Sequence, residues 1–283
     1  MSTLVLGGTG TTGSRTVKHL LAAGAPSVKV ATRDPAKASP LMTGADFVAW
    51  DWAAPAGWPS ALAEVSAIYL VLPYAPPPQA GIVAAVIEAA KAADVKHIVK
   101  LTGQLHVAEQ YTIGADNRVA DDLLKTSGLT YTLVDCNFFM SNHLTFNKDL
   151  IMGTGSFYGA SDGKPTSFIS PDDIGAVSAA ALLDPAAHHG KKINCSGAAI
   201  TEDDVAKYLT LHLGKEVTYV NLPPEALAKG MADSGVPPFL VQNLVSLETW
   251  KASGGADFGE GSADMIDILG RAPQTYPEYL ASL

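Results

Sequence analysis

The stretch Leu4-Val5-Leu6-Gly7-Gly8-Thr9-Gly10-Thr11-Thr12-Gly13 decides the fold of this chain. Its apolar start is typical of a buried strand, and a helical pattern begins near its end. Glycines at this junction let the backbone approach a pyrophosphate, whose charge then lies against N–H groups at the helix start. The stretch therefore predicts a dinucleotide-binding turn, and the alternative is a glycine-rich turn without a ligand. The predicted cofactor contacts in the turn are Gly7, Gly10, Thr11, Thr12 and Gly13.

The first half of the chain alternates short apolar segments with helical patterns. Strands are expected at residues 4–6, 28–32, 47–50, 67–72, 97–101 and 131–134, and helices at residues 12–23, 81–93 and 114–127. Strands that are apolar throughout and separated by helices form parallel sheets covered on both faces. We therefore predict an α/β fold with a doubly wound, parallel-sheet Rossmann domain over residues 1–145.

The second half is predicted to form a smaller C-terminal α/β cap. After Asn142 a loop-rich stretch is indicated by glycines at positions 153, 155, 159 and 163. Ser170 and Thr201 each precede acidic residues, and such a hydroxyl caps a helix whose positive end the acids favour. We expect residues 171–195 to return to the Rossmann domain, and residues 146–283 to supply a small substrate-binding region.

The end of the second strand indicates which dinucleotide binds. An acidic residue there holds the ribose hydroxyls of NAD, whereas an arginine accommodates the 2′-phosphate of NADP. Here Thr32 is followed by Arg33 and then by Asp34, which favours NADP(H) over NAD(H). Two alternatives stay open. Arg33 could be a solvated turn residue while Asp34 caps the next helix, or Asp34 could turn toward the ribose and make NADH the better ligand.

Ligands of parallel sheets bind beside the carboxyl ends of the strands. Several other residues follow such strand ends, and each is either a ligand contact or a packing residue. We assign to the cofactor Asp51, Leu72, Pro73, Thr102 and Gly103, and to the substrate Tyr74 and Gln104.

Composition narrows the class of protein. The 283 residues carry a formal net charge of -9 and are 47% hydrophobic, which fits a folded chain with a large core. Nucleic acid is not an expected partner, because phosphate binding needs clustered Lys and Arg. Prolines interrupt the uncharged stretch 67–87 and no basic leader is visible, so we expect no membrane partner and a cytoplasmic location. No metal site is predicted, and the expected buried thiols, rather than a redox pair, are Cys136 and Cys195.

These motifs resemble the NmrA-like family of atypical short-chain dehydrogenase/reductases over nearly the whole chain. The similarity rests on the turn 7–13 and on segments 95–102, 127–133, 137–142, 168–174 and 213–220. Asp51-Trp52 and Ser234-Gly235-Val236-Pro237 are also similar to features of the festuclavine and agroclavine dehydrogenases. The family includes quinone, dye and imine reductases, and regulators that bind NADP without turning it over.

The resemblance implies an NAD(P)-binding domain and a small C-terminal domain that together form a substrate cleft. By similarity, the nicotinamide lies along Cys136, Asn137 and Phe138. The arginine and proline that usually precede this motif are Asp135 and Cys136 here. We assign to the substrate Phe139, Asn142, which matches the Asn that closes the motif, and Phe168.

The usual catalytic pair of short-chain dehydrogenases is missing. In those enzymes a Lys four residues after a Tyr lowers the phenol pKa for proton transfer, and none of the nine tyrosines here has that partner. Asn117 stands at a position where the family frequently has a His, and Thr102 stands at a position where it often has a Ser. The remaining proton-donor candidates, each otherwise a surface or packing residue, are Tyr111, His106 and Tyr158.

These features predict an NADPH-dependent oxidoreductase that acts on a small, electron-poor, apolar substrate: a quinone, an iminium or a conjugated carbonyl. Hydride addition to a quinone or an iminium needs little proton donation by the protein, which suits a chain without the Tyr–Lys pair. The alternative is a redox sensor that binds NADP(H) and regulates a partner without catalysis. The oligomeric state, monomer or dimer, stays open.

Overall fold

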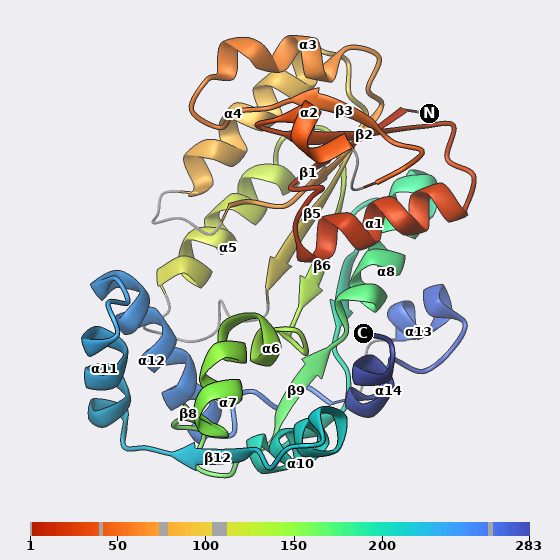
Figure 1. The fold of residues 1–283 in the computed structure, drawn as a ribbon. Helices are drawn as coiled ribbons and strands as arrows, with labels where there is room; N and C mark the ends of the chain where they lie inside the picture. Colours follow the sequence, from red (N-terminus) through yellow and green to blue (C-terminus); the bar gives the residue numbers. More distant parts are fainter. Residues whose placement is uncertain (1, 40–41, 74–78, 104–111, 260–262) are drawn as a thin grey trace.

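The computed structural model (Figure 1) describes residues 2–39, 42–73, 79–103, 112–259 and 263–283. Seven strands form the main sheet in the order β10-β6-β5-β4-β1-β2-β3, and every neighbouring pair is parallel. The strands run outward from β1 in both directions, which is the order of a doubly wound Rossmann sheet. The predicted fold class is therefore confirmed.

Strands and helices alternate along this part of the chain. The strands of the main sheet are β1 (Ser2–Leu6), β2 (Ser27–Thr32), β3 (Asp46–Ala49), β4 (Ala67–Leu70), β5 (His97–Gly103), β6 (Thr130–Cys136) and β10 (Lys192–Cys195). The helices between them are α1 (Thr11–Ala22), α2 (Pro35–Ala38), the 3-10 helix η2 (Pro55–Gly57), α3 (Trp58–Leu62), α4 (Gln79–Ala92), α5 (Thr112–Lys125), α8 (Pro171–Leu183) and α9 (Pro185–His188). Each predicted strand and helix of this part is found and differs only at its ends, whereas η2, α3 and α9 have no counterpart among the predicted elements.

Alternate residues of the strands build a core on each face of the sheet. In β1, Leu4 and Leu6 belong to the core that α3, α4 and α5 cover, while Val5 belongs to the core that α1 and α8 cover (Figure 1). All three side chains are fully buried. This is the burial expected of a parallel sheet between two helical layers, and it leaves the carboxyl ends of the strands as the place for a ligand.

The remaining elements follow β6 and β10 along the chain. They are β7 (Phe138–Phe139), α6 (Asn142–Phe146), α7 (Lys148–Thr154), β8 (Ser156–Gly159), β9 (Thr166–Ile169), β11 (Ala199–Ile200), α10 (Glu202–Leu213), β12 (Thr218–Asn221), α11 (Pro224–Asp233), α12 (Pro238–Ala252), α13 (Ala263–Leu269) and α14 (Tyr276–Ala281). Two small sheets, β11-β9-β7 and β12-β8, lie among them. Except for α13, which packs against α8 and β10, these elements form a cap below the ends of β5 and β6 in Figure 1.

The prediction of a loop-rich stretch after Asn142 is wrong. Residues 142–169 contain α6, α7, β8 and β9, and two of the glycines serve to end elements. Gly155 closes α7 in a left-handed conformation with φ 74°, and Gly159 ends β8, where a Cβ would lie 2.7 Å from Glu248 Oε2. Strands of four residues are too short to show a clear period in the sequence. None of the described helices is both long and apolar enough to cross a membrane.

Candidate cofactor and substrate site

The glycine-rich turn after β1 forms a tight backbone cradle at the start of α1. Gly10 N donates to Gly7 O at 2.9 Å, and Gly7 has a φ of 78°, which favours glycine. A Cβ on Gly13 would lie 2.2 Å from Gly7 O, so helix and strand can approach this closely only with glycine there. Within the described residues, no side chain caps α1 and no acid lies in its first turn. The first N–H groups of α1 are therefore available to an anion.

The chain after β2 gives Arg33 and Asp34 different roles. Asp34 Oδ1 accepts a hydrogen bond from Lys37 N at 3.1 Å and thereby caps α2. Binding the ribose through Asp34 would compete with this cap. Arg33 is exposed, and among the described residues no carboxylate pairs with it. Its guanidinium is available to a phosphate at the end of β2.

Asp51 lies in a turn that a tryptophan cluster holds in place. The rings of Trp50 and Trp58 stack with 4.5 Å between centroids, and Trp58 Nε1 donates to Asp51 O at 2.8 Å. The Asp51 carboxylate is exposed and accepts from Ala53 N at 2.9 Å. Asp51 is thus fixed at the carboxyl end of β3, with one carboxylate oxygen engaged by its own turn.

Buried polar side chains tie the carboxyl ends of β4 and β5 to the neighbouring helices. Gln79 Nε2, at the start of α4, donates to Pro73 O at 3.1 Å. Thr102 is buried, and its Oγ1 donates to Asp121 Oδ2 of α5 at 2.9 Å. The hydroxyl of Thr102 is therefore engaged away from a ligand. The half-buried residues at these two strand ends are Leu72, Pro73 and Gly103.

The carboxyl end of β6 carries a buried amide with an unused acceptor. Asn137 is 3% exposed, and its Nδ2 donates to Ser196 Oγ at 3.3 Å. No described residue donates to Asn137 Oδ1, and a buried oxygen without a donor is costly. Cys136 lies instead in the core near Cys195 of the neighbouring strand, and burial raises the pKa of its thiol. Both cysteines are free and buried, as predicted.

The remaining predicted site residues lie at different depths. Phe168 is 2% exposed and packs against Phe138 and His143, so its side chain belongs to the core of the cap rather than to an open surface. Tyr158 is exposed on β8, which pairs with β12 away from the main sheet (Figure 1). The half-buried members are Phe138, Phe139 and Asn142. Four predicted residues lie outside the described part of the chain: Tyr74, Gln104, His106 and Tyr111.

A buried lysine near this edge was missed by the sequence analysis. Lys100 of β5 donates to Asp121 Oδ1 at 2.8 Å and also to Asn117 Oδ1. Burial lowers the pKa of Lys100, an effect that Asp121 opposes. Because Asp121 also binds Thr102, one carboxylate fixes α5 to the end of β5. A lysine inside the apolar run 97–101 is the sequence signal for such a partner.

A second buried network lies in the cap. Lys251 Nζ is 3.0 Å from Glu202 Oε1 and 2.7 Å from Glu248 Oε1, and Glu202 Oε2 is 2.8 Å from His143 Nε2. Burial acts to raise the pKa of Glu202, but Lys251 and His143 outweigh it and hold that pKa well below its ordinary value. Only the contact between Glu248 and Lys251, three residues apart on α12, is local. Glu202 and His143 come from helices far apart in the sequence, so no local pattern indicates the network as a whole.

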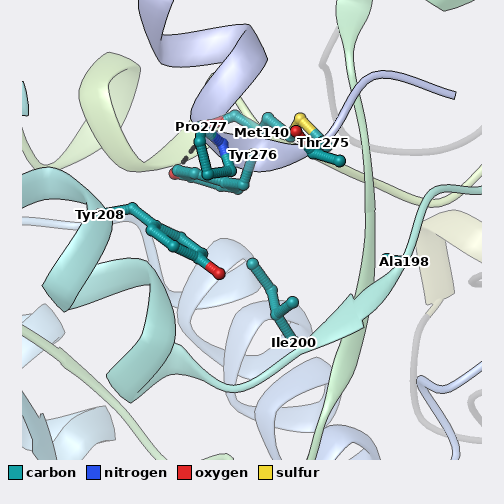
Figure 2. Close-up of a pocket in the computed structure, with 7 residues that line it drawn as sticks. All are labelled: Met140, Ala198, Ile200, Tyr208, Thr275, Tyr276 and Pro277. Atoms are coloured by element: carbon teal, nitrogen blue, oxygen red, sulfur yellow. Dashed lines mark hydrogen bonds between the residues drawn. The ribbon is translucent and has the colours of Figure 1, made fainter.

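The cap also contains a small apolar pocket (Figure 2). Its volume is about 120 Å³, and it lies between α10, α14 and the chain around β11. The pocket is lined by Met140, Ala198, Ile200, Tyr208, Thr275, Tyr276 and Pro277. None of these residues belongs to the predicted cofactor contacts, so the pocket is distinct from the glycine-rich turn.

Known proteins resemble this chain over its full length. The NmrA-like family profile matches residues 2–280. An NAD(P)H azoreductase of Xenophilus azovorans is 33% identical over 98% of this chain and 96% of its own, and quinone oxidoreductase 2 of Escherichia coli is 31% identical over 99% and 97%. A crystal structure of an Escherichia coli NADPH-dependent quinone oxidoreductase complexed with NADPH superposes with a TM-score of 0.86, at 26% identity and 99% coverage of both chains. The glycine-rich turn, the sheet order and these full-length matches together show that the chain belongs to the NmrA-like family.

Proposed function

We propose that this chain is an NADPH-dependent reductase that passes a hydride to a small, electron-poor, apolar acceptor. Quinones are the acceptor class expected to react best, and the other candidate acceptors are iminium ions, conjugated carbonyls and azo compounds. The observation that carries the proposal is the glycine cradle at the uncapped start of α1, with exposed Arg33 at the end of the neighbouring strand. Two full-length relatives that are named for NAD(P)H azo and quinone reduction support the chemistry.

The residues present fit a molecule of NADPH. The first N–H groups of α1 would hold the pyrophosphate, and Arg33 would pair with the 2′-phosphate. Asn137 Oδ1 would accept a hydrogen bond from the nicotinamide carboxamide, which would give this buried oxygen the donor it lacks. NADPH supplies the hydride when it is bound, and the chain supplies its position and orientation.

The proposed reaction needs a proton as well as a hydride. A quinone takes the hydride from NADPH and a proton from water, which gives a hydroquinone and NADP⁺. A hydroquinone anion is stable enough to be protonated by solvent, so the site needs no strong acid. This agrees with the lack of a Tyr–Lys pair in the sequence. An azo nitrogen is far more basic once the hydride has added, so we expect azo dyes to depend more on a proton donor and to react more slowly.

Anaerobic NADPH oxidation with a panel of acceptors tests the proposal. The panel holds 1,4-benzoquinone, an azo dye, a cyclic iminium ion and a conjugated ketone. We expect the largest kcat/KM for the quinone, with one hydroquinone formed for each NADPH consumed. The Gly10→Val variant serves as the control for reduction outside the site, because it should not bind the cofactor.

Two other outcomes would replace the proposal. Tight NADPH binding without oxidation by any acceptor would support a redox sensor that regulates a partner. If the protein does not bind NADPH at all, both the reductase function and the sensor function are wrong. The glycine-rich turn would then have a structural role only.

A further inference from the structure

The buried polar network of the cap contacts the segment after β6 at both ends. We use the name cap network for the side chains of Lys251, Glu202, Glu248, His143 and Tyr276. At one end of the segment, Lys251 Nζ lies 4.6 Å from the centroid of the Phe138 ring. At the other end, the Tyr276 hydroxyl donates to Met140 O at 3.2 Å. Segment 138–140 follows Asn137 directly, so it lies beside the predicted nicotinamide position.

The contacts between these two ends are continuous. Lys251 binds Glu202, Glu202 binds His143 Nε2, and His143 Nδ1 lies 2.9 Å from the Tyr276 hydroxyl. These side chains come from α12, α10, α6 and α14. One chain of hydrogen bonds therefore joins four helices of the cap and holds the side chain of Phe138 and the backbone of Met140.

Stability alone gives little reason for such a network. Burying an ion pair costs solvation free energy, which the attraction between the two charges offsets only in part. Replacing such a pair by apolar residues of similar volume often leaves the stability of a protein unchanged or raises it. Lys251 and Glu202 are 6% and 4% exposed, and Lys251 Nζ lies over the aromatic rings of Phe138 and Phe168. Hydrogen bonds are directional, so they fix the orientation of the side chains that they join. Apolar contacts alone leave that orientation less restricted.

We propose that the cap network is a positioning device that sets Phe138 and Met140 against the nicotinamide and its acceptor. The proposal rests on the proposed reductase function. Lys251 acts through the face of the Phe138 ring, an attraction that depends on its positive charge. It is therefore a positioning residue, and replacing it should change the rate of hydride transfer more than the affinity for NADPH.

The test compares Lys251→Met with the wild-type protein in three measurements: NADPH affinity by titration, the emission spectrum of bound NADPH, and the anaerobic single-turnover rate with 1,4-benzoquinone. We expect nearly unchanged NADPH affinity, an altered emission spectrum and a single-turnover rate lower by about 10- to 100-fold, as for a small misplacement of reacting groups. Lys251→Arg keeps a cation over the ring and should recover most of the rate.

Two further variants separate positioning from stability. Lys215→Met is the matched control, because Lys215 also lies in the cap but, among the residues that the structure describes, binds only the backbone oxygens of Ile151 and Met152; its rate should equal the wild-type rate. The double variant Lys251→Met with Glu202→Gln removes one charge of each sign. It should unfold at a higher temperature than Lys251→Met alone while the rate stays low. A rate that recovers together with stability would overturn the proposal.

The measurements also distinguish this proposal from the proposed function. If the wild-type protein binds NADPH but reduces no acceptor, the proposed reductase function is wrong. The emission spectrum of bound NADPH then tests the positioning role of the cap network by itself. An unchanged spectrum in Lys251→Met would then overturn the positioning role, and a changed spectrum would support it. If NADPH does not bind, both proposals are wrong.

Discussion

Gly10 and Gly13 lie in the same turn but restrict the chain in different ways. Within the described part of the chain, a Cβ on Gly10 would meet only Gly7 O, at 3.2 Å, whereas a Cβ on Gly13 would lie 2.2 Å from the same atom. We therefore expect Gly10→Val to abolish NADPH binding while the fold is kept, because the branched side chain occupies the place of the pyrophosphate. Gly13→Ala should instead lower the free energy of unfolding by about 1–3 kcal/mol or more.

Calorimetric titration with NADPH and denaturant unfolding of both variants test this difference. Wild-type NADPH affinity in a folded Gly10→Val protein would show that no pyrophosphate lies in this turn. Wild-type stability in Gly13→Ala would show that helix α1 can move away from β1 without cost.

Arg33 is the residue on which the choice between NADPH and NADH depends. A guanidinium–phosphate contact contributes roughly 1.5–3 kcal/mol, or about 10- to 150-fold in affinity. We expect Arg33→Ala to weaken NADPH binding by that factor and to leave NADH binding nearly unchanged. Raised salt should reduce the wild-type preference for NADPH, because Arg33 is exposed.

The matched control for this experiment is Lys37→Ala, which removes a nearby exposed cation that the structure does not place at the end of β2. Titration of all three proteins with both cofactors decides the matter. Equal affinities of the wild-type protein for NADPH and NADH would mean that Arg33 is an ordinary surface residue. Tighter binding of NADH would favour the ribose-binding role of Asp34 over its role as the cap of α2.

At the scale of elements, strand β5 begins with a histidine whose protonation opposes folding. Burial, followed by the neighbouring His189 and His188, lowers the pKa of His97 to about 4, and in an unfolded chain this pKa is about 6.5. The unfolded state therefore takes up the proton first as the pH falls. The contribution of neutral His97 to stability is complete above about pH 6.5 and is lost as the pH falls to about 4. It amounts to at most about 3 kcal/mol.

Urea unfolding at a series of pH values measures this loss. We expect the free energy of unfolding of His97→Gln to fall less steeply than that of the wild-type protein between about pH 6.5 and pH 4. The Thr130 hydroxyl, which lies 2.8 Å from His97 Nδ1, can still bond to the amide of the glutamine. Parallel curves for the two proteins would mean that folding does not lower the pKa of His97.

Elements that carry their own local signal could be predicted from the sequence. Strand β1 is apolar and ends in glycines, and two helix starts follow capping rules: Ser170 Oγ accepts from Asp172 N, and Thr201 forms a capping box with Asp204. Strands β8 and β9 could not be predicted, because they are short and are defined by partners distant in the sequence. The same holds for side chains: the place of Arg33 follows from one strand end, whereas the pairing of Lys251 with Glu202 depends on the whole cap.

At the scale of the whole molecule, the C-terminal segment returns to the helix layer of the Rossmann sheet. Asp173 of α8 is fully buried, and its carboxylate binds Arg271 Nη2 and Gln274 N. Its place in the first turn of α8 is all that the sequence indicates for this acid. Its partners lie about a hundred residues away in the sequence. No local sequence pattern therefore indicates this contact between the C-terminal segment and α8.

Hydride transfer from NADPH is the event on which the proposed function depends most directly. The decisive measurement is an anaerobic single turnover in which the protein, loaded with NADPH that carries deuterium at the transferred C4 position, is mixed with 1,4-benzoquinone. We predict that NADPH and quinone disappear in equal amounts and that deuterium slows the reaction. Two results would contradict a reductase whose site lies at the carboxyl ends of the sheet strands: bound NADPH that persists in excess quinone, or NADPH oxidation at the rate of the protein-free mixture.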